Sequence, residues 1–112
     1  MRVGGILETA LYVADPAATA VEVTLEPGQA GSPHRHPGPV LGYVLEGEYE
    51  WAIDDQPAKV LKTGDTFYEP AGCLHRVSKN PGTVKARVLA WVIHPRDAKD
   101  LVLQTWDLLD YE

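Results

Sequence analysis

The sequence predicts an all-β fold, because short alternating runs, frequent turn residues and the lack of a long helical pattern all point to strands. Apolar and polar residues alternate over short runs separated by glycine, proline and aspartate, which is typical of a β-sandwich or barrel. Nine prolines and ten glycines are spread through the 112 residues and leave little room for a long helix. Only residues 17–20 favour a helix locally, and Asp15 and Pro16 before them could start one turn.

Six to eight short strands are expected. The first clear run, residues 21–25, ends at Pro27 and Gly28. Residues 43–53 alternate more regularly, but Gly47 interrupts them, and a glycine within a strand often marks a bulge at which the inward-facing set can change. The later expected elements are a hairpin turn at 54–57, strands at 58–61, 66–69 and 84–93, and an apolar tail with Leu101, Leu103, Trp106, Leu108 and Leu109. From Val88 onward the 84–93 run is nearly apolar on both faces, which suits a buried strand. The tail is expected to form an edge strand or an irregular docked segment.

Length and composition favour one globular domain. We divide it into an N-terminal arm or strand (1–20), a core barrel (21–94) and a C-terminal segment (95–112). The formal net charge of −6 argues against nucleic acid or an anionic membrane surface as a partner. Cys73 is the single cysteine, so an intrachain disulfide is excluded. No apolar segment approaches the ~20 residues that span a bilayer, and a cytoplasmic location is the expectation.

Three of the four histidines fall in contexts that suit metal binding. His34 and His36 are two residues apart, and in an extended chain residues i and i+2 point to the same face. Both imidazoles can therefore reach one point in space, as a divalent ion with nitrogen ligands requires. His75 follows a separate turn that contains Pro70 and Gly72. A His-x-His pair alone is more often a surface or hydrogen-bonded pair, so the flanking residues decide between the two interpretations.

These flanking residues resemble the two motifs of the cupin superfamily, specifically those of its small one-domain members. The first motif places His-x-His, a glutamate and a second glycine at fixed spacings after a glycine. The chain matches it with Gly28, His34, His36, Val40 in the glutamate position, and Gly47. The second motif is a glycine, then Pro-x-Gly, a histidine and an asparagine, and the chain matches it with Gly64, Pro70, Gly72 and His75, while Asn80 falls one place late. The resemblance spans residues 28–80.

The resemblance implies a jelly-roll barrel, the double-stranded β-helix of cupins, with a metal ion inside it. The usual cupin site has three histidines and one glutamate, and Val40 cannot ligate. His34, His36 and His75 are therefore the implied ligands of one divalent ion, with iron favoured and zinc, nickel, copper or manganese as alternatives. Three neutral imidazoles would leave the ion its full charge and open positions for water and substrate. A vestigial site that no longer binds metal is the alternative.

Five further residues are candidates for the site. Glu69 is a candidate general acid or base if it faces the interior, and an ordinary surface charge otherwise. Cys73 is a candidate thiolate near the metal or an inert buried residue, and His94 is a candidate ligand or base or a hydrogen-bonded residue at a strand end. Val40 and Tyr43 are pocket candidates. The aromatic residues could line a pocket, but they more often form core or dimer contacts, and they are Tyr43, Tyr49, Trp51, Phe67, Tyr68 and Trp91.

Two classes of function follow from the resemblance. The favoured one is a metalloenzyme that acts on a small organic molecule, with a dioxygenase preferred because the three-histidine set lacks the carboxylate. Isomerase, cyclase or lyase chemistry is the enzymatic alternative. The other class is a non-catalytic module that binds or senses a ligand, although no helix-turn-helix segment supports a regulator. Small cupins commonly form homodimers, and the apolar run at residues 6–13 is a candidate dimer strand.

Overall fold

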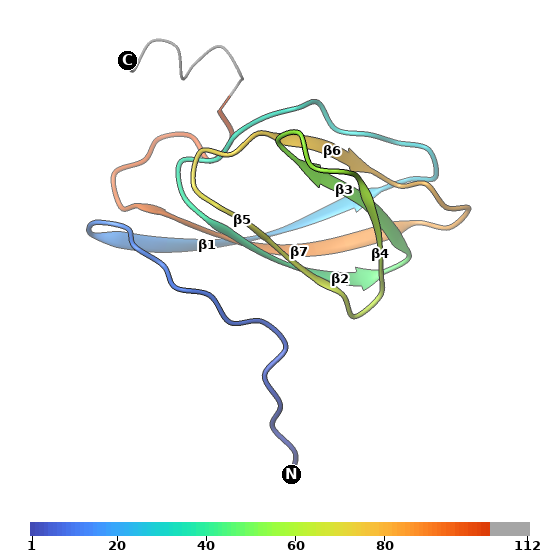
Figure 1. Cartoon of the computed structure of the whole chain (residues 1–112), viewed down its shortest axis with the longest axis horizontal. Coiled ribbons are helices and arrows are strands. Elements are labelled where there is room, and N and C mark those ends of the chain that lie inside the picture. The colour runs from blue at the N-terminus through green and yellow to red at the C-terminus, as the bar shows by residue number, and fades with distance from the viewer. Residues whose placement is uncertain (104–112) are drawn as a thin grey trace.

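The computed structural model describes residues 1–103 as two antiparallel β-sheets that face each other, without a helix among these residues. The strands are β1 (Pro16–Leu25), β2 (Val40–Glu46), β3 (Glu48–Ile53), β4 (Lys59–Lys62), β5 (Thr66–Glu69), β6 (His75–Lys79) and β7 (Ala86–Pro95). One sheet has the order β1-β7-β2-β5 and the other the order β4-β3-β6 (Figure 1). The prediction of an all-β fold with six to eight strands is confirmed.

The hydrophobic core lies between the two sheets. Strand β7 pairs with β1 on one side and with β2 on the other, and its alternate residues Ala86, Val88, Ala90 and Val92 are buried. The opposite face of β7 is also apolar, but it carries Trp91, which is 45% exposed. Between Val88 and Ile93 both faces of β7 are therefore apolar as predicted, whereas the described chain covers only one of them.

Gly47 is the point at which the chain passes from one sheet to the other. It has a φ of +75°, and an added Cβ there would approach the Lys85 carbonyl oxygen to 2.6 Å, so a side chain is excluded. Before it, Val40 and Val44 of β2 face the core, whereas after it Tyr49 and Trp51 of β3 do so. The inward-facing set therefore changes from even to odd positions, and the irregularity predicted at Gly47 is confirmed by a register shift between β2 and β7 at this end of β2.

The expectation of a helical turn at residues 17–20 is wrong. These residues are part of β1, which begins at Pro16 and pairs in register with β7, from Pro16 opposite Pro95 to Leu25 opposite Ala86. Pairing along ten residues outweighs the weak local helix propensity of a short alanine-rich stretch. The barrel therefore begins five residues earlier than the expected strand at 21–25, and β7 is shifted two residues later than 84–93.

The turns and the chain ends complete the fold. The turn at residues 54–57 joins the antiparallel strands β3 and β4, as predicted for a hairpin. Leu103 forms an isolated antiparallel bridge with Arg35, while the tail residues Trp106, Leu108 and Leu109 lie outside the described residues. Residues 6–13 form no strand, and the chain before β1 extends beyond the sheets toward the N-terminus (Figure 1). It contacts β5 at Ile6, whose carbonyl accepts a hydrogen bond of 3.4 Å from Thr66 Oγ1. Within residues 1–103, no helix is long and apolar enough to cross a membrane.

Candidate metal centre

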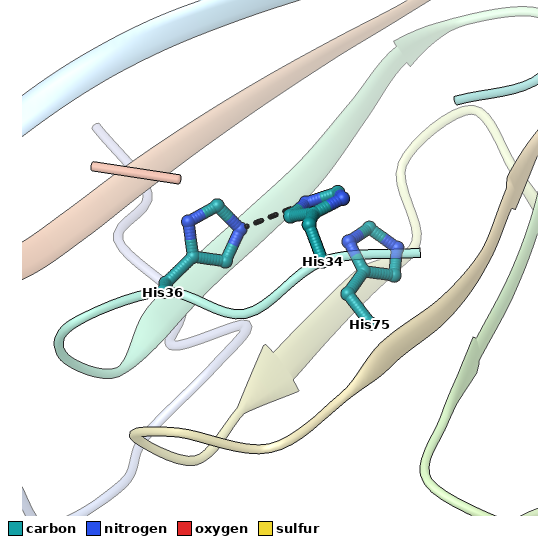
Figure 2. Close-up of side chains that lie close together, drawn as sticks. All are labelled: His34, His36 and His75. Atoms are coloured by element: carbon teal, nitrogen blue, oxygen red, sulfur yellow. Dashed lines mark hydrogen bonds between the residues drawn. The ribbon is translucent and has the colours of Figure 1, made fainter. Parts of the chain in front are cut away.

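His34, His36 and His75 converge on one point at the end of the barrel. His34 and His75 form an isolated antiparallel bridge, in which the His34 amide donates to the His75 carbonyl at 3.2 Å and the His75 amide donates back at 2.8 Å. The two-residue spacing then places His36 on the same side as His34, with their Nε2 atoms 3.2 Å apart (Figure 2). One nitrogen from each of the three rings lies within 4.8 Å of the others. The three predicted ligands are therefore brought together by backbone pairing.

Backbone carbonyls orient two of these rings. Nδ1 of His34 lies 2.7 Å from the Ser32 carbonyl oxygen, and Nδ1 of His36 lies 2.6 Å from that of Leu101. A carbonyl oxygen only accepts hydrogen bonds, so Nδ1 carries the proton in both rings and Nε2 keeps its lone pair. Two unprotonated Nε2 atoms thus face each other, which is the arrangement that a metal-binding imidazole pair requires.

Burial favours the neutral form of two of the histidines, His36 and His75. It lowers the pKa of His75 to about 3, and the neighbouring His34 and His36 rings lower it further. Burial also lowers the pKa of His36, against a smaller opposite effect of its hydrogen bond to Leu101. Neutral imidazole is the form that binds a metal ion, so these rings need not lose a proton to do so near neutral pH.

Glu69, at the end of β5, is buried beside the histidines with a relative exposure of 1%. Trp51 Nε1 donates a hydrogen bond of 2.9 Å to its Oε2, which also lies 3.3 Å from His75 Nδ1. Its Oε1 lies 3.8 Å from His36 Nε2. Burial raises the pKa of Glu69 to about 7, although the hydrogen bond from Trp51 opposes this shift. Of the two interpretations of this residue, the structure places its carboxyl in the interior.

Two buried polar atoms at this cluster test whether a cation fits. Glu69 Oε1 and His75 Nδ1 are both buried without a hydrogen-bond partner, and such atoms are rare unless an ion or a water satisfies them. Two donors about 2.1 Å from a common ion lie about 3.0 Å apart at a right angle and about 3.4 Å apart at a tetrahedral angle. The 3.2 Å separation of the His34 and His36 Nε2 atoms falls in that range. The residues present therefore fit a divalent metal ion.

The cluster opens on a cavity of about 210 Å³ between the sheets. Its walls are mostly aliphatic and aromatic, and they include Val21, Val23, Val40, Phe67, Val88 and Val92. Val40 is 2% exposed and takes part in the wall only as an apolar side chain. A small, largely apolar molecule beside an ion is what such a space can hold.

Three other candidates lie outside this cavity. Tyr43 has the opposite orientation in β2 to Val40 and Val44, so it is on the outer face of the sheet. His94 is buried in β7, where Nε2 lies 2.9 Å from Thr19 Oγ1 and Nδ1 lies 2.8 Å from the Pro95 carbonyl, so both nitrogens have structural partners.

Cys73 is half-buried and packs against the hydrophobic core. Burial raises the pKa of its thiol to about 12, and the Glu69 and Asp54 carboxylates add to this shift. The thiol is therefore protonated at neutral pH, and the structure gives it no thiolate character. Arg35, between the two histidines, donates to the Gly72 carbonyl at 2.7 Å and so ties the two histidine-bearing loops together.

Two partners of the site could not be found from the sequence. The Leu101 carbonyl that orients His36 is a backbone group and has no residue signature, and the Trp51 indole reaches Glu69 across 18 positions in the chain. The valines of β1 and β7 that line the cavity did have a signal. Their alternation along each strand predicts one common face, and the sheet arrangement then turns that face inward.

Fold and site together define a β-barrel protein with a candidate metal centre in its interior. Residues 21–92 match the Cupin domain family, and the chain belongs to this family. No curated protein sequence matches the chain.

Several solved structures share the fold of this chain, although their sequence identity to it is low. The chain is similar to DMSP lyase DddQ from Ruegeria pomeroyi, with 22% identity and a TM-score of 0.69 over 83% of this chain and 45% of the lyase. It is similar to an oxalate oxidase, with 20% identity and a TM-score of 0.66 over 92% of this chain and 63% of the oxidase. It is also similar to a predicted oxalate decarboxylase from Thermotoga maritima, with 26% identity and a TM-score of 0.60 over 67% of this chain and 64% of the decarboxylase. The chain thus spans less than two thirds of each of these proteins.

Proposed function

We propose that the protein is a metal-dependent enzyme that acts on a small, largely apolar organic molecule, with iron and dioxygen chemistry favoured. The observation that carries this proposal is the convergence of three imidazoles at the wall of an apolar cavity. A bound iron(II) ion with open coordination positions would supply activation of oxygen and of the substrate.

The residues of the chain contribute binding and orientation. His34 and His36 hold fixed orientations through their Nδ1 atoms, which leaves Nε2 for the ion. The apolar wall excludes water and selects for size, because a cavity of about 210 Å³ admits only a small molecule. The Tyr49 hydroxyl lines the same cavity and is bonded to Ser78 Oγ at 2.8 Å, so it is a polar group that can orient a substrate.

The charge of the cavity favours a neutral substrate over a dianion. The structurally similar proteins include enzymes named for oxalate, which carries two carboxylates. No lysine or arginine is among the described residues that line the cavity here, and Glu69 adds a carboxyl group. An oxalate ion would therefore have the bound metal as its only cationic partner in this wall, which supports a substrate with less charge.

Metal analysis tests the proposal. Protein purified without a chelating tag is expected to hold one divalent ion per chain, iron by preference, and the variant His34→Ala/His36→Ala/His75→Ala is expected to hold none. His94→Ala is the matched control, because His94 is a buried histidine whose nitrogens already have partners outside the cavity. A metal-free parent protein, or a triple variant that keeps its ion, would contradict the proposed centre.

Oxygen uptake tests the reaction class. A panel of 1,3-dicarbonyls, thiols and catechol-like compounds is expected to include a substrate that is consumed together with dioxygen. Turnover without oxygen uptake would instead indicate an isomerase, lyase or cyclase, and binding without turnover would indicate a ligand-binding or sensing protein.

The proposed assembly is a homodimer formed through the outer face of the four-stranded sheet. Leu41, Tyr43, Tyr68, Leu89 and Trp91 share this face through the register of β2, β5 and β7. The arm at residues 1–13 carries exposed apolar side chains that include Ile6, Leu11 and Tyr12. A second copy presents the same apolar face and the same arm, so two copies related by a two-fold axis would bury these surfaces against each other. The single cysteine, which forms no intrachain disulfide, supports a cytoplasmic location.

A further inference from the structure

We propose that Glu69 is a fourth protein ligand of the metal ion, bound through Oε1. From β5 it supplies the carboxylate that the cupin motif places at position 40 in β2, where this chain has Val40. This inference rests on the proposed metal centre and extends it. It changes the predicted ligand set from three nitrogens to three nitrogens and one oxygen. It also assigns Glu69 to the ion rather than to proton transfer with a substrate.

The register of the sheet places Glu69 next to position 40. Val40 and Glu69 are opposite each other in the antiparallel pair β2–β5, and both side chains face the cavity. Side chains directly opposite in such a pair have Cβ atoms only about 5 Å apart. A glutamate at 69 can therefore reach the space that a glutamate at 40 would occupy.

The donor separations agree with a shared ion. Glu69 Oε1 lies 3.8 Å from His36 Nε2, which itself lies 3.2 Å from His34 Nε2. Donors about 2.1 Å from one ion are separated by about 3.0 Å at a right angle and by about 4.2 Å when they lie on opposite sides. Both observed distances fall within this range, so Oε1 needs no large movement to join the two imidazoles around an ion.

The two oxygens of Glu69 have different surroundings. Oε2 accepts the hydrogen bond from Trp51 Nε1, which fixes the carboxyl group, whereas Oε1 is buried without any hydrogen-bond partner. A metal-binding carboxylate commonly has its second oxygen held in this way by a neighbouring donor. Trp51 is thus a positioning residue that presents Oε1 to the ion.

The charge balance also calls for a cation. Among the described ion pairs, Glu69 has only the imidazoles of His36 and His75 as partners, and neither lysine nor arginine is among them. Its contact with His75 Nδ1 at 3.3 Å is not a hydrogen bond, because that nitrogen has no hydrogen-bond partner. An ionised carboxylate in this place is therefore uncompensated until a cation binds.

The ligand set has a consequence for ion selectivity. Carboxylate oxygen suits manganese and other hard ions, whereas imidazole suits nickel, copper and zinc. The loss of Glu69 should therefore weaken Mn²⁺ binding more than Ni²⁺ binding. A residue that only supports the fold or the His75 ring would weaken the binding of both ions alike.

Calorimetric titration of the metal-free protein with Mn²⁺ and with Ni²⁺ tests this inference. Glu69→Gln keeps an oxygen for Trp51 but loses the charge, so its Mn²⁺ affinity is expected to fall at least tenfold, and by more than its Ni²⁺ affinity. Glu46→Gln is the matched control, because it removes one carboxylate from the same sheet at a place where that group pairs with Arg87 outside the cavity. The exchanged pair Val40→Glu/Glu69→Val is expected to regain Mn²⁺ affinity to within tenfold of the parent protein.

A crystal structure of the Mn²⁺-loaded parent protein gives the second readout, with Oε1 expected about 2.2 Å from the ion. An Oε1 more than about 3 Å from the ion, an unchanged Mn²⁺ affinity in Glu69→Gln, or an equal loss for both ions without recovery in the exchanged pair would each overturn the assignment. If the parent protein binds these ions and Glu69→Gln binds them equally well, the three-histidine centre stands and Glu69 is not a ligand. If the parent protein binds neither ion, the proposed metal centre fails together with this inference.

Discussion

At the scale of single residues, the site contains ionisable groups whose uncharged form is favoured by burial, among them His75 and Glu69. Burial lowers the pKa of His75 to about 3 and raises the pKa of Glu69 to about 7. In the metal-free protein both groups are therefore mainly neutral near pH 6. A divalent ion reverses this balance for the carboxylate, because it favours the ionised form. The stability of the metal-free protein should therefore report on Glu69 directly.

The first prediction at this scale concerns Glu69→Gln without metal. The pKa of Glu69 is raised to about 7 in the folded protein, whereas an unfolded carboxyl titrates near 4.5. The stability that this carboxyl contributes is thus full below about pH 4.5 and is lost as the pH rises through 7. Glu69→Gln does not titrate, so its free energy of unfolding should gain about 2 kcal/mol on the parent protein between pH 5.5 and 8.

Urea unfolding followed by tryptophan fluorescence, with a chelator present, measures this difference at each pH. Because the two proteins share their other titratable groups, the difference between their unfolding free energies isolates position 69. If the difference stays flat or shrinks with rising pH, ionisation of the buried Glu69 carboxyl does not destabilise the folded protein, and the prediction is wrong.

The three histidines could be predicted from the sequence, whereas the environment of Glu69 could not. His34, His36 and His75 have a local signature, since the i, i+2 spacing and the flanking glycines and prolines are visible without a fold. The direction of Glu69 depends instead on its register opposite Val40, and its fixed carboxyl depends on Trp51 in the other sheet. Such contacts between distant segments have no counterpart in a local pattern.

At the scale of strands and turns, the alternation of apolar and polar residues predicted most elements. Pairing with neighbouring strands determined the bounds that this alternation did not predict. The turn at 54–57 was predicted, and Gly47 was identified as a point where the inward-facing set can change, because turn residues impose backbone geometry locally. The extension of β1 back to Pro16 was missed because residues 17–20 take their conformation from β7 rather than from their own propensity. Element bounds are therefore a tertiary property in this barrel.

Gly42 gives the prediction at this scale. It faces Phe67 across β2–β5, and an added Cβ would lie 2.0 Å from Phe67 Cζ, so the ring packs directly on the glycine. Gly42→Ala should lower the free energy of unfolding by about 1–3 kcal/mol, because Phe67 must move toward the cavity.

Denaturant unfolding of Gly42→Ala beside Gly31→Ala checks this cause. Gly31 is the control, since a Cβ there would meet nothing closer than 3.8 Å, an ordinary contact with Ser78. In a Phe67→Leu background the cost of Gly42→Ala should shrink, because the smaller side chain leaves room for the methyl group. Equal losses at positions 42 and 31 would contradict the contact with Phe67.

At the scale of the whole molecule, the barrel is apolar inside and also on one outer face. The inner face holds the cavity, and the outer face of the four-stranded sheet presents Trp91 with its neighbours Leu41 and Leu89. Trp91 pairs with Ala20 on the β1 side, so no large side chain of the described sheet shields it there. Water contact of such a face is unfavourable, and association with a second copy would remove it.

Trp91→Glu should therefore convert a dimer into a monomer. The charge would lie at the centre of the proposed interface, where two symmetry-related carboxylates would face an apolar surface without partners. Sedimentation velocity over a range of concentrations should give a dimer for the parent protein and a monomer for the variant. Val84→Glu is the matched control, because Val84 is 61% exposed and precedes the sheet. Since the metal cluster lies on the opposite face of this sheet, the monomeric variant should still bind its ion, and a parent protein that is monomeric throughout would contradict the interface.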